Sequence, residues 1–247
     1  MRATLSLVRR EFSAYFLSPI AYVVFAVFLG VTGYRFNETL GQLTERGPEG
    51  VAFPFQFMLT DTWFWLVFLF IPSLLTMRLL AEERGSGTLE MLLTAPLRDW
   101  QIVLAKFIAC FAFYLLLWVP TLLYLPVLAA AGVDLRPAAS SYLGLALAGG
   151  MFLALGLFVS SLVRSQMVSA LLSLALSLVF VIAGFWRSDV DTGTAWYRAK
   201  SFFAVPLHFE RNFSRGVVDT RQIVLYLSVT LFCLFLTVRS LESRRWR

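Results

Sequence analysis

Acidic residues and glycines gather in one stretch, residues 77–101, which interrupts an otherwise apolar chain. Its carboxylates, Glu82, Glu83 and Glu90, offer polar contact with another surface, and simple solvation is the alternative. With His208 as its one histidine, the sequence cannot assemble a His/Cys metal cluster. It also lacks a Ser-His-Asp or Cys-His arrangement for nucleophilic catalysis. The stretch therefore predicts contact with another surface, and no enzyme activity is expected of this chain.

Nucleotide-binding motifs are also missing from the sequence. A P-loop requires a glycine directly before its lysine, whereas alanine precedes both Lys106 and Lys200. We therefore expect no Walker-type ATP site, and no other cofactor, in this chain.

A short amphipathic helix is expected over residues 86–97. Ser86 or Thr88 can accept hydrogen bonds from its first N–H groups, and Pro96 limits it to about two turns. Its leucines recur at three- and four-residue spacing and share one face: Leu89, Leu92, Leu93 and Leu97. Such a helix either lies on lipid or docks on another protein.

The composition places the chain in a lipid bilayer. Of its 247 residues, 59% are hydrophobic and 15% are charged, against roughly 25% charged in soluble proteins. Cys110 and Cys233 lie inside apolar runs and are interpreted as small core residues.

Uncharged apolar runs predict a single all-α membrane domain over residues 1–247, with six spans. Each run approaches or exceeds the ~20 residues that cross ~30 Å of hydrocarbon. The runs cover about 20–34, 62–80, 102–131, 142–163, 166–186 and 222–238. Asp99 is the expected N-cap of the third of these helices, which would begin at Trp100.

An interfacial helix is expected before the first span, within residues 1–18. Its body is placed at residues 3–16, and the chain breaks near Ser18 and Pro19.

Basic residues give the orientation. With a cytoplasmic N-terminus, the whole net charge of +6 falls on the cytoplasmic side, and the outer side is balanced. Six spans then place both termini in the cytoplasm. Because the charge follows membrane topology, it predicts no nucleic-acid surface.

Two segments on the outer side are too long to be turns. Residues 35–61 are expected to form a short helix and a loop. Residues 187–220 carry many apolar side chains around Pro206, which predicts interfacial or re-entrant packing, or a small lid over the bundle.

The middles of the six expected spans carry no ionisable residue. Ion-coupled carriers place such residues at membrane depth, where they bind the driving ion. The sequence therefore predicts that energy reaches this chain from a partner.

Serines recur every fourth residue from the fourth span into the fifth: Ser161, Ser165, Ser169, Ser173 and Ser177. Small residues in such a stripe favour close helix packing, and a solute-lined wall is the alternative. The fourth span carries its own small residues, interpreted as packing positions: Gly144, Ala148, Gly150, Ala154, Gly156 and Ser160.

Trp63 and Trp65 begin the second span. An aromatic belt at the headgroup level explains them, and a role in a transport path is the alternative. Pro72 is expected to kink this span.

The sequence resembles the ABC-2 type permeases over nearly its whole length. The resemblance is carried by EERGSGTLEMLLTAP at 82–96 and QIVLAKF at 101–107. Further runs resemble the gliding-motility and nitrous-oxide-reductase-maturation branch of that family: RREF at 9–12, SPIAY at 18–22, PLHFERNFSRGVVDTR at 206–221 and LESRRWR at 241–247.

The resemblance implies a coupling helix within residues 82–100, seated on a separate ATPase subunit that binds ATP and Mg. The residues it assigns to this coupling are Glu82, Glu83, Gly85, Gly87, Thr88, Leu89, Glu90, Leu92, Leu93 and Pro96. It also implies a second permease copy or paralogue, with the path between the two copies near the second and fifth spans. Trp63, Trp65, Ser169, Ser173 and Ser177 are the candidates for that path or interface.

The resemblance further implies export across a bacterial inner membrane and a companion subunit with an extracytoplasmic domain. A non-transporting anchor, which passes mechanical work to an extracytoplasmic partner, is one alternative. A carrier or channel that works alone is another, and the uncharged span interiors argue against it. The sequence does not identify a substrate.

Overall fold

The computed structural model describes residues 2–50, 54–59, 61–88, 98–185 and 201–245. Within these ranges every regular element is a helix, as the all-α expectation requires. The elements up to residue 88 are α1 (Arg2–Phe16), α2 (Pro19–Gly50), α3 (Pro54–Leu59), α4 (Thr62–Thr76) and α5 (Ala81–Gly85). The later ones are α7 (Asp99–Trp118), η1 (Val119–Leu123), α8 (Tyr124–Ala130), α9 (Arg136–Leu162), α10 (Gln166–Phe185), α12 (Val205–Arg211), η2 (Phe213–Arg215) and α13 (Thr220–Arg245).

Five stretches of helix in the described chain are long and apolar enough to cross a membrane. They are Pro19–Glu45, Asp99–Ala130, Arg136–Leu162, Gln166–Ala183 and Thr220–Ser243. The second expected span is not confirmed as one long helix. It consists of α4, with fifteen residues, a turn over residues 77–80, and α5.

The helix of the first span is longer than expected. It does not end near Tyr34, because polar side chains stabilise its continuation. Arg35 pairs with Glu38, and the Thr39 hydroxyl donates to the Arg35 carbonyl. The helix bends at Gly47, whose φ of 72° favours glycine. The segment 35–61, expected to form a short helix and a loop, is largely helical where the structure describes it.

The interfacial segment is a helix, α1, as expected, and it ends at Phe16. The Ser18 N–H donates to the Tyr15 carbonyl, and α2 begins at Pro19, so the chain turns at the expected place. Tyr15 stacks on Phe113 of α7 at 4.8 Å, and its hydroxyl donates to the Leu75 carbonyl. The helix is therefore packed against α7 and the end of α4.

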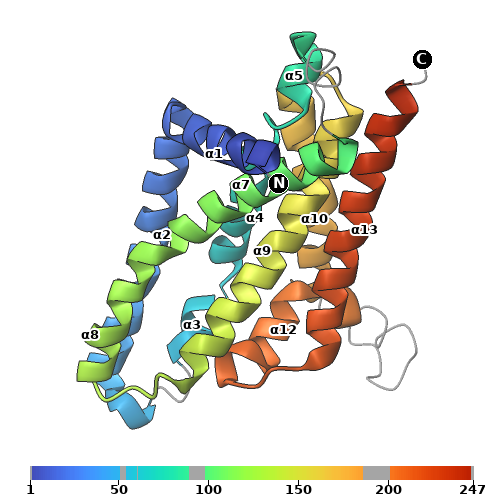
Figure 1. The fold of residues 1–247 in the computed structure, drawn as a ribbon. Helices are drawn as coiled ribbons and strands as arrows, with labels where there is room; N and C mark the ends of the chain where they lie inside the picture. The colour runs from blue at the N-terminus through green and yellow to red at the C-terminus, as the bar shows by residue number, and fades with distance from the viewer. Residues whose placement is uncertain (1, 51–53, 60, 89–97, 186–200, 246–247) are drawn as a thin grey trace.

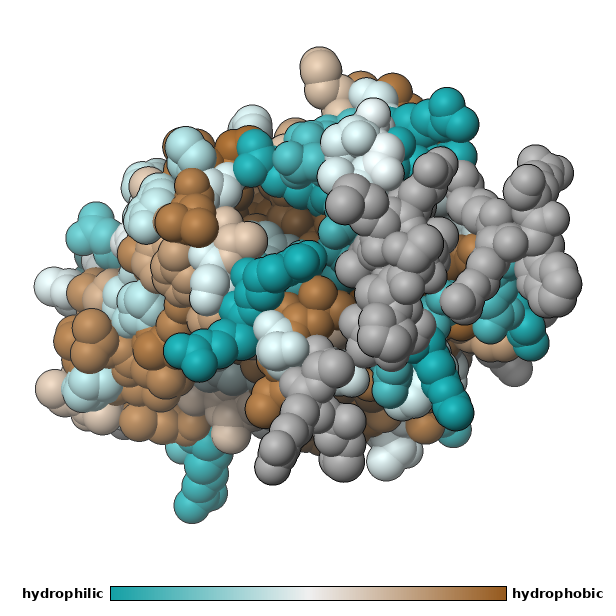
Figure 2. Space-filling view, turned by 45° about the horizontal axis from the view of Figure 1, so that its top comes forward, coloured by the Kyte–Doolittle hydropathy of each residue, from teal (hydrophilic) through white to brown (hydrophobic). Residues whose placement is uncertain are grey.

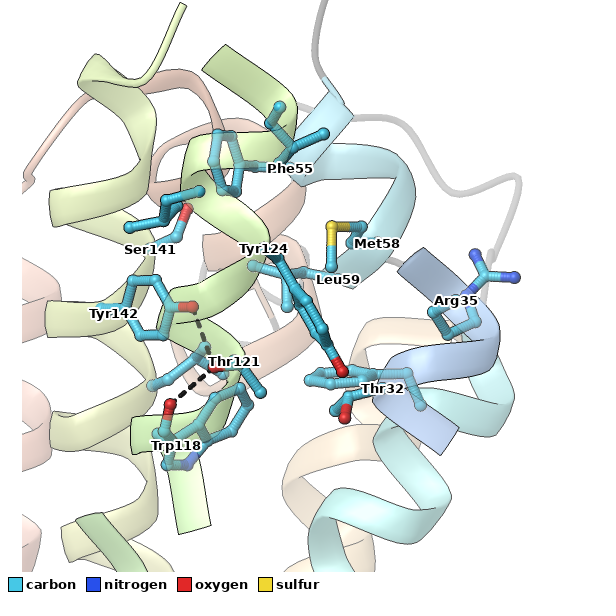
Figure 3. Close-up of a pocket in the computed structure, with 14 residues that line it drawn as sticks. Thr32, Arg35, Phe55, Met58, Leu59, Trp118, Thr121, Tyr124, Ser141 and Tyr142 are labelled. Atoms are coloured by element: carbon cyan, nitrogen blue, oxygen red, sulfur yellow. Dashed lines mark hydrogen bonds between the residues drawn. The ribbon is translucent and has the colours of Figure 1, made fainter. Parts of the chain in front are cut away.

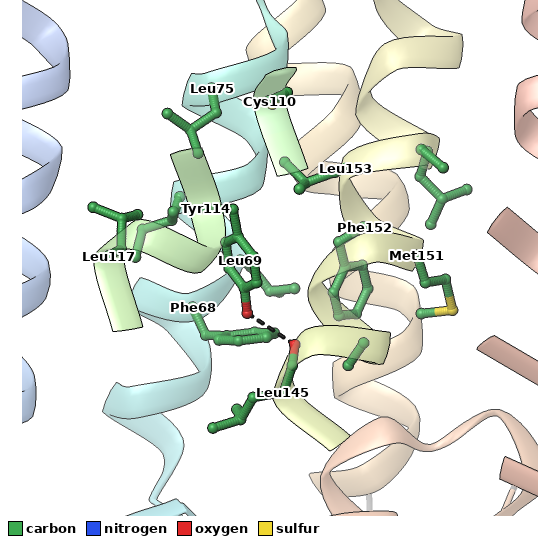
Figure 4. Close-up of a cluster of buried hydrophobic side chains, with 14 of the residues drawn as sticks. Phe68, Leu69, Leu75, Cys110, Tyr114, Leu117, Leu145, Met151, Phe152 and Leu153 are labelled. Atoms are coloured by element: carbon green, nitrogen blue, oxygen red, sulfur yellow. Dashed lines mark hydrogen bonds between the residues drawn. The ribbon is translucent and has the colours of Figure 1, made fainter. Parts of the chain in front are cut away.

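The centre of the bundle is α9, which lies among α4, α7, α10 and α13 (Figure 1). Small residues permit these close approaches. A Cβ added at Gly149 would lie 2.2 Å from the Tyr114 ring, and one at Gly156 would lie 2.1 Å from Thr76 Oγ1. Figure 4 shows Tyr114 reaching across this core, where its hydroxyl donates to the Leu145 carbonyl at 2.9 Å. The interpretation of the fourth-span glycines as packing positions is confirmed at Gly144 and Gly156. Gly149, which is not selected from the sequence, is a further one.

Residues 201–215 pack onto the end of the bundle opposite α5 (Figure 1). Phe209 is buried edge-to-face against Trp65 at 5.1 Å, and Phe213 is buried where a Cβ on Gly144 would lie 2.8 Å from its ring. These contacts agree with a lid over the bundle. Residues 187–200 of the expected segment lie outside the described residues.

His208 has a structural position in α12. Its Nδ1 lies 2.8 Å from the Tyr226 hydroxyl and its Nε2 lies 3.3 Å from the Ser201 carbonyl. A carbonyl can only accept, so Nε2 carries the proton and Nδ1 accepts from Tyr226. Burial lowers the pKa of His208 to about 4, which keeps the ring neutral.

Candidate functional site

The charged stretch singled out in the sequence begins as α5, directly after a four-residue turn. This short helix stands at the end of the molecule where α1 and the C-terminus also lie (Figure 1). From the sequence, this stretch and both termini are expected on one side of the membrane, and α5 does lie at the same end as α1 and the last turns of α13.

The start of α5 is held by a side chain of the central helix. The Ser160 hydroxyl accepts hydrogen bonds from the Leu80 N–H at 3.2 Å and the Ala81 N–H at 3.0 Å. The first N–H groups of a helix have no partner within it, and Ser160 supplies one from α9. All three residues are buried, so the hydroxyl takes the place that water has at an exposed helix start.

The far side of α5 contacts the corner between α9 and α10. Arg84 Nη1 donates to the carbonyls of Ser161 and Leu162 at the end of α9. A Cβ added at Gly85 would lie 2.9 Å from the Arg164 carbonyl, so only glycine fits without a shift of backbone. Gly85 therefore serves close packing as well as chain flexibility.

A buried lysine joins α5 to two further helices. Lys106 on α7 is 1% exposed, and its Nζ lies 2.7 Å from Glu83 Oε1 on α5 and 3.2 Å from Glu11 Oε2 on α1. Burial raises the pKa of Glu83, and the positive charge of Lys106 opposes that shift. Glu11 also pairs with Arg10 at 2.9 Å. We call Glu11, Glu83 and Lys106 the buried ion cluster.

Sequence reasoning placed Glu83 on a partner surface, whereas the structure gives its carboxylate an intramolecular partner. In the sequence analysis, Lys106 is considered only in excluding a P-loop and as part of the resemblance, and Glu11 is not selected. Lys106 is the one lysine inside an apolar run, and that isolation is the signal that points to a buried counterion. Glu82, by contrast, is exposed and available to a partner.

Ser86 and Thr88 act at the end of α5. The Ser86 hydroxyl donates to the Glu82 carbonyl at 2.9 Å, and the Thr88 hydroxyl donates to the Glu83 carbonyl at 3.4 Å. These bonds satisfy carbonyls that a helix end leaves free. The N–H groups that the two hydroxyls are expected to cap belong to a helix outside the described residues. Gly87 has a φ of 76°, which a residue with a side chain rarely adopts.

The expected amphipathic helix falls mostly outside the described residues. Leu89, Glu90, Leu92, Leu93 and Pro96 all belong to that part. The helix after it begins at Asp99, one residue earlier than expected. Its N-cap is Arg98, whose N–H donates to Gln101 Oε1 at 3.0 Å, and not Asp99.

The candidate residues for a transport path or dimer interface differ in their exposure. Ser169, Ser173 and Ser177 are at most 1% exposed, as their interpretation in helix packing requires. Trp65 is fully buried against Phe68 and Phe209, whereas Trp63 is 73% exposed. The structure thus separates the two tryptophans, and Trp63 alone fits an aromatic belt.

A pocket lies at the opposite end from α5, between α2, α3, α8 and α9. Figure 3 shows Tyr124 projecting into it, beside Thr121 and Tyr142, whose hydroxyls are 2.8 Å apart. Its volume of about 30 Å³ is enough for a water molecule or two. Among the described helices it is therefore a small pocket between packed side chains.

The described side chains offer no group of three His, Cys, Asp or Glu residues that could hold a metal ion. The arrangement at α5 is instead suited to transmitting force, because one short helix is bonded to α9, α7 and, through Lys106, α1.

Comparison with known proteins agrees with this architecture. A family model described as ABC-2 family transporter protein matches residues 49–204, which include α4, α5, α7 and α9. A search of curated proteins finds no match.

Proposed function

Because this chain belongs to the ABC-2 family of transporter proteins, we propose that α5 and the segment after it couple a separate ATPase to export across the membrane. The chain is a multi-pass membrane protein and a permease component of an ABC transporter. Such a component works with an ABC ATPase, and often with a second permease copy. ATP and Mg belong to that ATPase in this proposal.

The observation that carries the proposal is the attachment of α5 to the spans. Ser160 and Arg84 bond it to α9, and Glu83 bonds it to Lys106 of α7. An exposed loop could yield when a partner pushes it, whereas a helix bonded on several sides passes the displacement to its neighbours. Closure of the ATPase against this end would therefore move α9 and α7 together.

The contact with the ATPase is assigned to Glu82, which is exposed, and to the segment that follows α5. Glu82 and Glu90 supply the charge, and Leu89, Leu92 and Leu93 supply an apolar seat. Glu83 transmits the movement instead, since its carboxylate faces Lys106. The glycines Gly85 and Gly87, with Thr88 and Pro96, shape the backbone between these two parts.

The proposed membrane, orientation, transport path and companion subunit follow from the family resemblance given in the sequence analysis. The chain is placed in the cytoplasmic membrane of a bacterium with both termini in the cytoplasm, and the path is placed between two permeases. A companion subunit with an extracytoplasmic domain belongs to the gliding-motility-type branch. The end formed by α3, α8 and α12 is the surface proposed for it.

The test reverses the charge of one residue in the segment that follows α5. The chain is tagged, purified from its native membrane with its ATPase, and the yield of ATPase and the ATP hydrolysis rate are measured. Glu90→Arg should lower the recovered ATPase or its activity about tenfold, equivalent to about 1.4 kcal/mol of binding. Glu242→Arg is the matched control, since Glu242 lies on α13 at the same end of the molecule. Full recovery and activity in Glu90→Arg would remove the assignment.

A further inference from the structure

A cavity that adjoins the buried ion cluster at Glu11 lies between the turn joining α1 to α2 and the junction of α4 with α5. It opens on the end of the molecule seen in Figure 2, where a hollow with apolar walls is bordered by hydrophilic surface. Its volume is about 330 Å³, roughly ten times that of the pocket near Tyr124. The cavity is large enough to hold part of a small molecule.

Arg78 is the cation of this cavity. Its Nη1 donates to Ser18 Oγ at 2.6 Å, while its Nε is buried and has no hydrogen-bond partner. Within the described chain no carboxylate lies within 4.0 Å of it, unlike Arg10, Lys106 and Arg239, which have ion pairs. A guanidinium that lines a cavity and has no carboxylate partner is suited to bind an anion there, and its planar fork matches a phosphate.

The other charged residues of the cavity do not supply that counterion. Glu11 is engaged by Lys106 and Arg10, as described above. Glu82 is exposed and lies four positions after Arg78 in the chain. It forms no ion pair with a described residue. Arg78 is therefore a positive charge that lines the cavity without an ion pair to any described carboxylate.

The remaining walls are apolar and lie where the chain meets lipid. They include Leu17, Ile20, Leu74 and Leu79. Leu17 is 86% exposed and lies two residues before the first candidate span, so hydrocarbon of a bound amphiphile can reach it. A free phosphate would gain nothing from these walls, whereas an amphiphile would bury its hydrocarbon there.

We propose that this cavity binds an anionic glycerophospholipid of the surrounding bilayer. Its phosphate contacts Arg78, and the start of an acyl chain lies along Leu17, Ile20 and Leu74. The site goes beyond the coupling role and depends only on the embedding of the chain in a membrane. A bound lipid would connect α1, α2 and α4 at the foot of α5.

The first test measures which lipid stays bound. The purified protein is placed in nanodiscs with equal amounts of phosphatidylglycerol and phosphatidylcholine, and retained lipid is read by native mass spectrometry. Wild type should retain phosphatidylglycerol selectively. Arg78→Gln should lower that retention about tenfold, as expected for loss of a charge-assisted contact. Arg239→Gln, which changes an exposed arginine at the same end, should retain it as wild type does.

A second pair of variants tests the cavity without altering Arg78. Ala14 lines the cavity and is exposed, so Ala14→Trp fills it without disturbing the core. Ser13→Trp is the control, because Ser13 is the exposed neighbour that does not line the cavity. Ala14→Trp should lose the lipid and Ser13→Trp should keep it.

Three outcomes would overturn the proposal. Equal retention by Arg78→Gln and wild type would remove Arg78 from the site. Equal retention of the two lipids by wild type would remove the anionic selectivity. Displacement of the lipid by inorganic phosphate at equal concentration would show that the acyl chain contributes nothing. Each outcome leaves the ATPase-coupling proposal standing, since none measures ATP hydrolysis.

Discussion

Lys106 Nζ lies 2.7 Å from Glu83 Oε1, although the two residues are 23 positions apart and belong to different helices. The lysine is 1% exposed and the glutamate side chain 19% exposed. Removing the lysine leaves two acidic groups at the buried ion cluster without their shared cation. Breaking a buried ion pair in this way costs about 3–5 kcal/mol.

Lys106→Met should therefore lower the free energy of unfolding by ~3–5 kcal/mol, measured by denaturant titration in detergent. The matched control is Arg239→Met, which breaks an exposed pair with Glu242 and should cost about 0–1 kcal/mol. In Glu83→Gln the methionine substitution should cost less than in wild type, since the two sites interact. Equal small losses for the Lys106 and Arg239 variants would contradict the role of the buried ion cluster.

Gly156→Ala should destabilise the bundle by about 1–3 kcal/mol, because the new Cβ would lie 2.1 Å from Thr76 Oγ1. Thr76→Ala should restore part of the loss by removing the nearest atom. Gly30→Ala is the control, since nothing lies within 4 Å of a Cβ at that helical position. Thermal unfolding of the four proteins in detergent gives the comparison, and identical melting temperatures for the two glycine variants would refute the packing argument.

Ser160→Ala should free the start of α5. It removes the acceptor for the Leu80 and Ala81 N–H groups, and a buried donor without a partner costs about 1–3 kcal/mol. We expect faster hydrogen exchange at Leu80 and Ala81. Ser243→Ala, which removes an exposed hydroxyl bonded to the Ser240 carbonyl, is the control and should leave exchange in α5 unchanged. Unchanged exchange in Ser160→Ala would show that other contacts secure α5.

His208 should make stability depend on pH in the acid range. Burial lowers its pKa to about 4 from an ordinary 6.5, so folding favours the neutral ring. Its contribution is complete above pH 6.5 and is lost as pH falls through about 4, with a total of about 3 kcal/mol. His208→Gln should flatten this part of the pH profile of melting temperature. A profile that is the same in both proteins would contradict the neutral assignment.

The long helices were predictable because their signal is local. The apolar runs predict both ends of α10 to within one residue, whereas α9 begins six residues earlier and α13 ends seven residues later than its run. Pro19 gives the break after α1. The continuation of α2 past Tyr34 was not predictable from charge, because Arg35 and Glu38 satisfy each other within one helical turn.

The candidate site was found only in part, for a related reason. Glu82 and Glu83 stand together in the sequence, but one is exposed and the other faces a lysine of another helix. Glu11 joins the same lysine from 95 positions away. No local spacing encodes such a meeting, whereas the isolation of Lys106 in an apolar run hints at it.

The shortness of α4 has a consequence for the bilayer. Fifteen residues rise about 22 Å, which falls short of the ~30 Å hydrocarbon layer, so this helix alone would be mismatched with the membrane. The lipid need not thin around it, because other helices shield α4 and the turn at residues 77–80 fills the missing depth. Leu80, which ends that turn, and Ala81, which begins α5, are buried, and the Ser160 hydroxyl accepts a hydrogen bond from each of their N–H groups in place of water.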